Sequence, residues 1–492
     1  MKYDTQILIV GAGPAGLTLA CLLAQFQVPF IIIDKKSGIS SDIKACMLSS
    51  RSLEIFSDLG LMDQAMQLGQ VVQAFEVYRN NALAVSLDYQ RIQTRFPFNL
   101  HLGQPNTEKV LYEKLASQRI NVLWRHALHE FVQNEKAVTA TVMVENTAVT
   151  IQAEFLIGAD GATSLVRKFS QLDFKGETYP SHFLLGNVKL DADLSYDKAR
   201  LFFGDFGFLS VYPLPDHYMQ IGGNIIAPNH LAKPHFDELK KLFQDRCGYS
   251  GKLRDLKWLS YYRTHSRGVK ERVINRVILM GDAAQIVSPL TGLGMNAGIQ
   301  DAENLAWKLL LIVQKKASVD LLQSYQSERS WVSRKLISFS NILETVYTMK
   351  QAHSKSLREF MLSQSLTHEA AQQKEVARLM QKDLNYRTSS LLQERSLVGF
   401  QSPDPWLPLY NHFLFDLLER GRMIVLSFSG QQKKPIVQIG YLDSCEFDMP
   451  AMHAKTIDDT DFILHRAFSI VDSVRFIIRP DRYVAFSDQK SH

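Results

Sequence analysis

The feature that most constrains the fold of this chain is a short glycine-rich turn near its start, Gly11-Ala-Gly13-Pro14-Ala15-Gly16. Apolar runs lie on both sides of the turn, and a second strand-like run ends in Asp34. In such a strand–turn–helix–strand unit the first glycine permits the tight turn, the second lets the backbone approach a pyrophosphate, and the third packs helix on strand. An acid such as Asp34 can accept hydrogen bonds from ribose hydroxyls. The turn therefore predicts a dinucleotide-binding βαβ unit, for either a nicotinamide or a flavin.

Composition limits the class of protein. The chain has 492 residues, 46% hydrophobic and 21% charged, which is typical of a globular protein of two to four domains. Its net charge of +5 is mild and no run of five or more Lys/Arg is present, so no nucleic-acid partner is expected. Residues 6–26 carry no charge, but glycines at turn spacing favour the βαβ unit over a targeting or membrane segment.

The four cysteines lie far apart, without the spacing of a disulfide scaffold or a zinc site. The histidines at 182, 217 and 265 likewise have no ligand spacing, so no metal is expected. We therefore expect a protein of a reducing compartment, the cytoplasm.

Two further segments distinguish a flavin from a nicotinamide. Asp160-Gly161 directly follows a strand-like run, and Gly281-Asp282 follows another. The second is followed by Gly292-Leu-Gly294 at the start of a strong helix pattern, where exposed backbone N–H groups stabilise negative charge. A carboxylate beside a polyol and a helix start beside an electron-rich ring are what a flavin needs.

These three segments resemble the fingerprints of the class A flavoprotein aromatic hydroxylases, the p-hydroxybenzoate hydroxylase and phenol hydroxylase group, over residues 4–345. The stretch 474–485 resembles the end of the phenol hydroxylase type, whose extra C-terminal domain is thioredoxin-like. The resemblance implies an α/β fold: a Rossmann-like FAD-binding domain of the glutathione reductase type, an inserted substrate-binding β-sheet domain and a small thioredoxin-like domain. Cys445 is alone in that last domain, so its role would be structural or associative.

The expected domain bounds follow the change of pattern along the chain. Strands of mixed apolar and aromatic content between about 181 and 226 predict the substrate sheet, and helical composition predicts a linker. The bounds are 1–180 with 265–345 for the FAD-binding domain, 181–264 for the sheet, 346–398 for the linker and 399–492 for the C-terminal domain.

The resemblance also assigns residues to FAD. Gly11, Gly13, Pro14, Ala15 and Gly16 would form the pyrophosphate turn, and Asp34 would bind ribose. The rest of the implied set is Lys44, Gln104, Leu128, Asp160, Gly281, Asp282, Pro289, Gly292, Leu293, Gly294, Met295 and Asn296.

Two positions depart from the family pattern. Lys44 stands where the family usually has Arg, which keeps the charge but loses the planar fork that grips phosphate, so FAD affinity is expected to be lower. Gln285 stands where the family usually has His.

The implied function is an FAD-dependent monooxygenase. NAD(P)H would reduce FAD, and O2 would give a flavin C4a-hydroperoxide that hydroxylates a phenolic or polyketide-like ring. Alternatives are a reductase or oxidase of other chemistry, a halogenase, against which the missing W-x-W-x-I-P motif argues, or a non-catalytic FAD-binding protein. The sequence leaves the substrate, the choice of NADH or NADPH and a homodimer open.

Several side chains have two readings. Tyr212 could hydrogen-bond a phenolate or could only pack in the core. The resemblance implies that Pro289 lines the flavin face, and Tyr212 and Pro289 are the two candidate catalytic residues. Arg167 could clamp phosphate or nicotinamide, or form a surface ion pair. The aromatic residues at 202–203 and 206–208 could be core or a substrate cage.

Overall fold

A parallel sheet forms the centre of the first domain in the computed structural model. The structure describes residues 4–40, 45–204, 207–225, 233–289, 292–348, 369–386, 389, 399–429, 436–442, 452–459, 463–468 and 473–487. The five parallel strands of this sheet have the spatial order β8 (Leu123–Trp124), β2 (Phe30–Asp34), β1 (Thr5–Val10), β11 (Thr147–Gly158) and β18 (Val277–Leu279). β17 (Val273–Ile274) adds an antiparallel edge.

Helices cover one face of this sheet and an antiparallel meander covers the other. The helical layer consists of α1 (Pro14–Gln25), α4 (Gln104–Ser117) and α7 (Gly294–Val313), whose apolar residues join those of β1 in one core. The other layer consists of β9 (His126–Gln133), β10 (Val138–Val144), the first part of β11 and α5 (Leu165–Phe169). The near-continuous apolar runs of β1 and β11 follow from burial on both faces.

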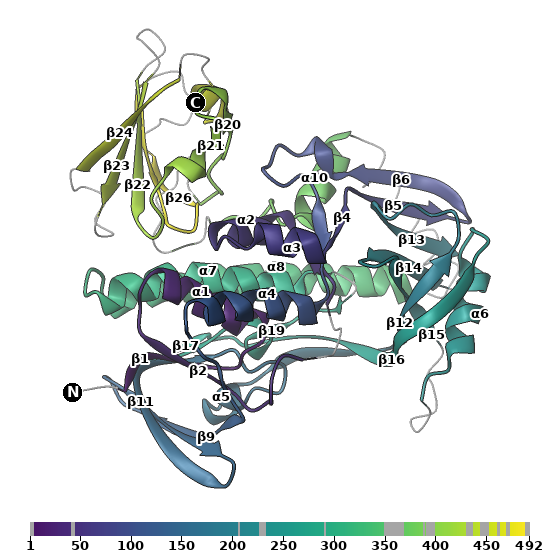
Figure 1. Ribbon diagram of the computed structural model, residues 1–492, viewed down its shortest axis with the longest axis horizontal. Helices are drawn as coiled ribbons and strands as arrows, with labels where there is room; N and C mark the ends of the chain where they lie inside the picture. Colours follow the sequence, from purple (N-terminus) through teal and green to yellow (C-terminus); the bar gives the residue numbers. More distant parts are fainter. Residues whose placement is uncertain are drawn as a thin grey trace.

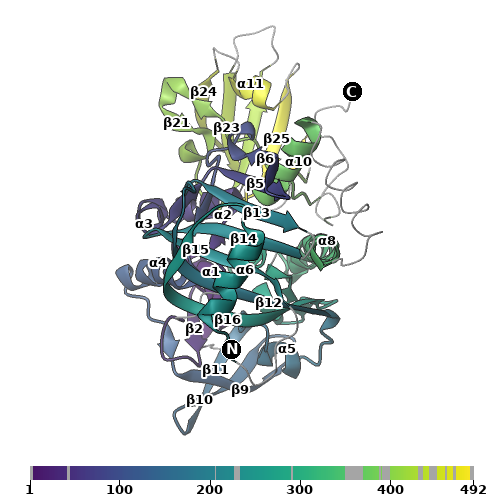
Figure 2. The ribbon, with the colours of Figure 1, turned by 90° about the vertical axis from the view of Figure 1, so that its right-hand side faces the viewer.

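A second, eight-stranded sheet lies beside the first domain (Figure 1). Its strands have the order β19 (Gln285–Ile286), β16 (Lys252–Gly268), β12 (Lys175–Asp191), β15 (Tyr218–Ile225), β14 (Gly207–Leu214), β13 (Lys198–Gly204), β5 (Ala74–Arg79) and β6 (Ala82–Asp88). Helix α6 (Phe236–Arg246) packs on its outer face (Figure 2).

The predicted range 181–264 for this sheet is therefore too narrow. The hairpin β5–β6 comes from the predicted FAD-binding range, because β5 pairs in parallel with β13 across more than a hundred residues of chain. β12 begins before the predicted start at 181, and β16 ends after the predicted end at 264. A long-range parallel pairing leaves no local pattern in the sequence, so the hairpin could not be assigned to the sheet in advance.

The remaining elements connect these sheets. A small sheet has the order β3 (Met47–Leu48), β7 (Asn99–His101) and β4 (Gln70–Val72). The other helices are α2 (Ser50–Asp58), α3 (Met62–Leu68), α8 (Leu322–Thr348) and α10 (Glu369–Leu379). α7 and α8 run through the middle of the molecule (Figure 1), and most of the predicted linker 346–398 lies outside the described residues. No helix in the described ranges is long and apolar enough to span a bilayer.

The C-terminal domain contains a five-stranded sheet and its own core. The strand order is β24 (Met452–Asp458), β23 (Ile436–Leu442), β22 (Met423–Phe428), β25 (Val474–Ile478) and β26 (Val484–Ser487), with α11 (Ile463–Ala467) and a hairpin of β20 (Trp406–Leu407) and β21 (His412–Phe413). Every pair in the described part of the five-stranded sheet is antiparallel, whereas a βαβ unit would place parallel strands side by side. The thioredoxin-like character of this domain stays a prediction.

Candidate functional site

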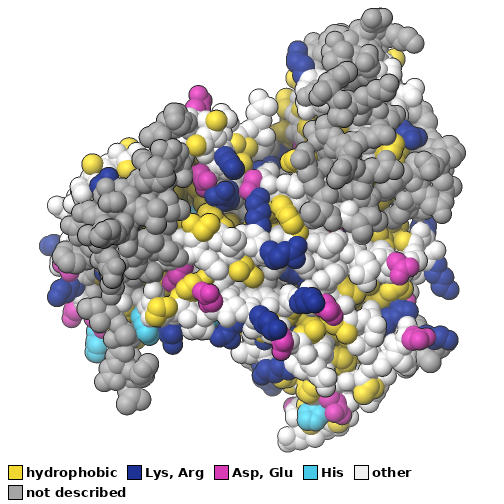
Figure 3. Space-filling view, turned by 180° about the vertical axis from the view of Figure 1, so that it is seen from behind, with side chains coloured by type: hydrophobic (Ala, Val, Ile, Leu, Met, Phe, Trp, Pro, Cys, Tyr) yellow, Lys and Arg dark blue, Asp and Glu magenta, His cyan; other side chains and the backbone are white. Residues whose placement is uncertain are grey.

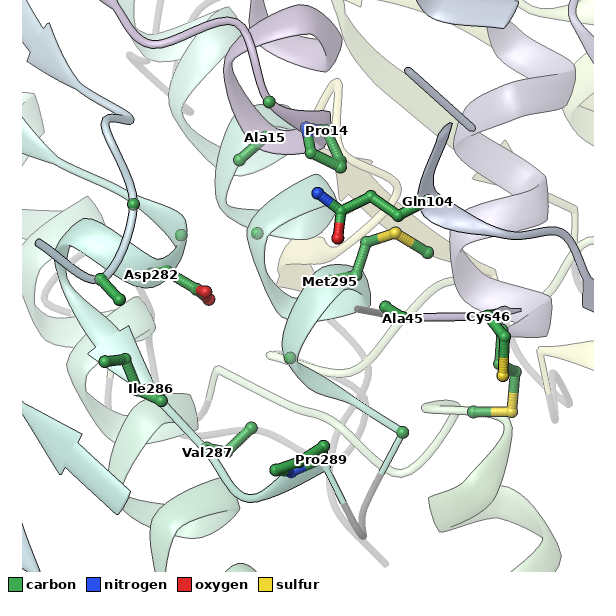
Figure 4. A pocket seen from close by; sticks show the side chains of 18 of the residues that line it. Pro14, Ala15, Ala45, Cys46, Gln104, Asp282, Ile286, Val287, Pro289 and Met295 are labelled. Atoms are coloured by element: carbon green, nitrogen blue, oxygen red, sulfur yellow. The ribbon is translucent and has the colours of Figure 1, made fainter. Parts of the chain in front are cut away.

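A cavity of about 1080 Å³ lies where the first domain meets the second sheet. Its wall contains the glycine turn after β1, the start of α7, one face of the second sheet and parts of α8 and α10. Figure 4 shows the part of the wall where Gln104, Met295, Asp282 and Pro289 surround an open space. Most of the predicted site residues, far apart in sequence, thus share one cavity.

The glycine turn fits a pyrophosphate. Gly11 has φ +110°, and a Cβ there would lie 2.3 Å from the carbonyl oxygen of Ala159. A Cβ at Gly16 would lie 2.0 Å from the carbonyl oxygen of Gly11, so this glycine lets α1 pack against the turn rather than lining the cavity. A Cβ at Gly13 would meet nothing within 4 Å, and α1 begins there without a side-chain cap. Backbone N–H groups at this helix start can therefore bind an anion directly.

Asp34 stands at the end of β2 and holds the turn in place. Its Oδ2 accepts a hydrogen bond from the Ala12 N–H at 2.8 Å, and its Oδ1 accepts one from the Lys36 N–H at 2.8 Å. Each carboxylate oxygen has a second lone pair, so Asp34, which lines the cavity, can still accept hydrogen bonds from ribose hydroxyls.

Asp160 caps a helix as well as lining the cavity. Its Oδ2 accepts from the N–H groups of Leu165 and Val166 at 2.7 and 3.1 Å, and Ser164 Oγ donates to its Oδ1. Burial raises the pKa of Asp160, against these hydrogen bonds. An acid is needed after this strand because its carboxylate accepts hydrogen bonds from the first N–H groups of α5.

Arg167 has neither of its two predicted roles. It is buried, and its guanidinium donates to the carbonyl oxygens of Ala283 and Ala162 at 2.9 and 2.8 Å. It thereby joins α5 to the loop that follows Gly281-Asp282, so two of the three sequence segments are fastened to each other.

The Gly281-Asp282 loop is held from behind by a buried acid. Asp301 accepts a hydrogen bond from the Gly281 N–H at 2.9 Å and pairs with Arg272 at 3.0 Å. The Asp282 side chain points into the cavity, where it can reach a polyol (Figure 4). Gln285 is buried behind the loop, and its Oε1 accepts from Arg272 at 2.7 Å.

The start of α7 forms another wall of the cavity. Gly292, Gly294 and Met295 line it, and α7 begins without a side-chain cap. Leu293 and Asn296 are buried behind the wall. The Asn296 side chain accepts from the Ser49 N–H at 2.8 Å and donates to the carbonyl oxygens of Met47 and Gly292 at 2.9 and 3.1 Å. It fixes the loop in place instead of facing the cavity.

The other predicted cofactor residues are also located. Gln104 and Leu128 line the cavity, and Gln104 Nε2 donates to Oε1 of Glu108 at 2.9 Å. Glu108 is a buried acid on the same wall that the sequence did not single out. Lys44 lies outside the described residues.

One face of the second sheet forms an apolar half of the cavity. Because successive strand residues point to opposite faces, alternate residues of three strands line it. These are Phe75 and Val77 of β5, Ala199, Leu201 and Phe203 of β13, and Phe208, Ser210 and Tyr212 of β14. Phe203 and Phe208 therefore belong to the cavity wall, whereas Phe202 stacks on Tyr78 in the core under α6.

The only charged groups on the described wall of this apolar half are Glu375 and Arg378 of α10. They pair with each other, with both N···O distances at 2.9 Å. Sequence analysis missed them, together with His101 and Cys46, because no motif marks residues that long-range packing brings to a cavity.

The comparisons with known proteins agree with this geometry. The family model described as "FAD binding domain" matches residues 4–340. The chain belongs to this family. FAD is its cofactor, and the predicted class, a class A FAD-dependent monooxygenase, is confirmed. The glycine turn, the Asp160-Gly161 segment and the Gly281-Asp282 segment all lie within the matched residues.

Curated relatives and solved structures extend the likeness. The chain is 32% identical over 355 residues to 6-methylpretetramide 4-monooxygenase of Streptomyces rimosus, which covers 70% of this chain but 63% of that protein. It is 28% identical to a flavin-dependent monooxygenase of Mycobacteroides abscessus over 97% of this chain and 96% of the relative. The flavin-dependent monooxygenase PieE, solved with FAD and substrate, has the same fold, with TM-score 0.76, 20% identity, and coverage of 99% and 97%.

Proposed function

We propose that this FAD-dependent monooxygenase uses NAD(P)H and O2 to hydroxylate a neutral phenolic ring of a small-molecule substrate. The observation that carries the proposal is that the flavin-binding wall and the apolar face of the second sheet enclose one continuous cavity. Reduced FAD supplies the activation of O2 for insertion of one oxygen atom into an aromatic ring. The relative with the 32% match is named 6-methylpretetramide 4-monooxygenase, which supports a monooxygenase reaction.

The chain's own residues have distinct roles in this proposal. The turn at Gly11–Gly16 binds the pyrophosphate, Asp34 binds ribose, and Asp282 binds the ribityl chain. The start of α7 at Gly294 and Met295 stabilises negative charge on the flavin ring. The paired charges of Glu375 and Arg378 leave no net charge on the described apolar half, which favours a neutral substrate.

Two residues on the substrate side complete the proposal. Pro289 lies on the cavity wall beside the start of α7, and in this proposal it would line the flavin face. Tyr212 lines the sheet side of the cavity, and in this proposal its hydroxyl would hydrogen-bond the substrate hydroxyl. The apolar residues around them exclude water from the reacting ring.

Product analysis tests the proposal. Purified holoenzyme is incubated with NADH or NADPH, ¹⁸O2 and a panel of mono- and polycyclic phenols, and products are identified by mass spectrometry. We expect one ¹⁸O atom in the product, with NAD(P)H consumed in proportion. Hydrogen peroxide formed in equal amount to oxidised NAD(P)H, with no hydroxylated product from any phenol, would contradict hydroxylation and indicate an oxidase.

Assembly and location are separate predictions. The dispersed cysteines, of which Cys21, Cys46 and Cys247 are free and buried, support a cytoplasmic, reducing environment. Sedimentation of the purified holoenzyme would decide between a monomer and a homodimer. On the face in Figure 3, basic and acidic side chains are interspersed among the described residues.

A further inference from the structure

A buried histidine lies on the cavity wall without a role in cofactor binding. His101 is the last residue of β7 and is 2% exposed. It lines the cavity, and its ring centroid lies 5.9 Å from that of Tyr212, with the two planes at 75°. The ring is thus at the junction between the small β3–β7–β4 sheet and the substrate-facing side of β14.

The hydrogen bonding of His101 fixes its tautomer. Nδ1 lies 2.8 Å from the carbonyl oxygen of Pro213. A carbonyl oxygen can only accept, so Nδ1 carries the hydrogen and donates it. Burial lowers the pKa of His101 to about 4, against the hydrogen bond to Pro213, so the ring is neutral near pH 7 and Nε2 carries a lone pair.

Nε2 remains available for a ligand. In the described ranges Nε2 has no hydrogen-bond partner in the protein. It is also not among the solvent-inaccessible side-chain atoms that lack a partner, so it is accessible from the cavity. Because the ring lines the cavity, this lone pair is open to a bound molecule. No carboxylate in those ranges forms an ion pair with His101, so nothing stabilises a permanent imidazolium.

The described side chains around His101 are uncharged. Across the small sheet, His101 faces Met47 on β3 and Gln70 on β4, and β14 contributes Tyr212. Cys46, next to Met47, donates its thiol to Gln220 Oε1 at 3.3 Å, and burial raises the pKa of the Cys46 thiol to about 12.

We propose that Nε2 of His101 accepts the proton of the substrate's ring hydroxyl during hydroxylation. This rests on the proposed function and assigns His101 as a catalytic residue that touches substrate, beside Tyr212. The proton acceptor lies beside Tyr212 on the cavity wall, so both side chains could contact the same substrate hydroxyl.

The chemistry suits a weak base. O2 that has received two electrons from NAD(P)H through FAD transfers one oxygen atom as OH to a ring carbon ortho or para to the hydroxyl, while its O–O bond breaks and the other oxygen leaves as hydroxide, which becomes water. Ring π electrons form the new C–O bond, and the positive charge is shared with the hydroxyl oxygen. The O–H bond then breaks, its electron pair forms a C=O bond, and the proton moves to Nε2. The hydrogen on the oxidised carbon then leaves as a proton to water, its C–H electron pair restores the aromatic ring, and the former C=O oxygen takes the proton back from Nε2. A cationic O–H is far more acidic than a phenol, so an imidazole of low pKa is sufficient and is unprotonated near pH 7.

An equilibrium titration tests the assignment without turnover. The probe is 4-nitrophenol, whose absorption changes on ionisation, bound to the oxidised holoenzyme. An acceptor at Nε2 stabilises the neutral phenol, so we expect the pKa of bound 4-nitrophenol to be about one unit higher in the wild type than in His101→Asn. The asparagine amide can still donate to Pro213 but places no acceptor at Nε2. An equal pKa in both proteins, or a lower one in the wild type, would overturn the assignment.

Turnover gives the second readout. With a phenolic substrate, His101→Asn is expected to lower kcat by about 10²-fold, whereas the methyl ether of the same substrate should react equally with both proteins. His465→Asn is the control, because His465 is a buried histidine of the C-terminal domain and should leave the 4-nitrophenol titration unchanged. A loss of kcat that is equal for the phenol and its methyl ether would make His101 structural. The titration needs neither NAD(P)H nor O2, so its result can be interpreted even if the enzyme does not hydroxylate phenols.

Discussion

The C-terminal sheet is joined to the FAD-binding domain by a buried carboxylate, Glu328 on α8. Its oxygens accept from Arg479 at 2.6 and 2.9 Å, from Lys308 at 2.9 Å and from Asn304 at 2.7 Å. Burial alone would raise the pKa of Glu328, but the charges of Arg479 and Lys308 hold it well below its usual range. Arg479 belongs to the β25–β26 turn, so these bonds connect the two domains directly.

Replacing this carboxylate with an amide, Glu328→Gln, should destabilise the protein by about 3 kcal/mol. Removing one partner of a buried ion pair costs about 3–5 kcal/mol. We take the lower end because Arg479 keeps its pair with Asp481 at 2.5 Å and glutamine keeps one carbonyl oxygen. This corresponds to a factor of about 150 in the unfolding equilibrium constant.

Urea unfolding followed by intrinsic fluorescence measures this loss. The pKa of Glu328 is lower in the folded than in the unfolded state, so its contribution is complete above the unfolded value near 4.5 and is lost as the pH falls below it. The difference between wild type and variant should therefore shrink as the pH falls below about 4.5.

Glu419→Gln is the matched control. Glu419 pairs with Arg422 at 3.0 Å just before β22 of the C-terminal domain, but the Glu419 side chain is 58% exposed. Such a surface pair contributes less than about 1 kcal/mol. Equal losses in the two variants, or a loss below about 1 kcal/mol for Glu328→Gln at pH 7, would refute the conclusion that this buried pair holds the domains together.

Three further substitutions test the cofactor and substrate sites. Gly16→Ala should lower the flavin content of purified protein more than tenfold, because its Cβ would lie 2.0 Å from a backbone oxygen. The control Gly38→Ala has open space around its Cβ and should keep its flavin, so equal ratios of flavin to protein absorbance in the two variants would contradict this. Asn296→Ala removes three hydrogen bonds to backbone and should lower the free energy of unfolding by about 2 kcal/mol, with faster flavin release seen by fluorescence; an unchanged release rate would show that the loop holds itself. Tyr212→Phe should raise KM for phenols and leave flavin affinity unchanged in a titration; an unchanged KM would leave Tyr212 with a packing role.

The cofactor half of the site could be predicted because its requirements are local. Gly11 and Gly16 have to be glycines because a Cβ at either position would clash with a backbone oxygen, and Asp34 follows at the end of the next strand. The acid of Asp160-Gly161 starts a helix within six residues. Such short-range constraints leave a readable spacing in the sequence.

The substrate half could not be predicted because its requirements are long-range. Which face of β14 carries Tyr212 depends on strand register, and a shift of one residue would reverse it. β5 joins the sheet only through its parallel pairing with β13. His101 reaches the cavity because β7 packs between β3 and β4, none of which has a distinctive motif.

Gln285, at a position where the family usually has histidine, supports the Gly281 loop and does not line the cavity. Gln285 is 3% exposed and is not on the cavity wall, so the replaced histidine position lies behind the flavin loop. Its Oε1 accepts from Arg272, which pairs with Asp301, and Asp301 in turn holds the Gly281 N–H. A neutral histidine would offer Arg272 a single ring nitrogen and would lose it on protonation, whereas the amide oxygen accepts at every pH. Glutamine at this position therefore affects how the Gly281 loop is supported and leaves the residues that line the cavity in place.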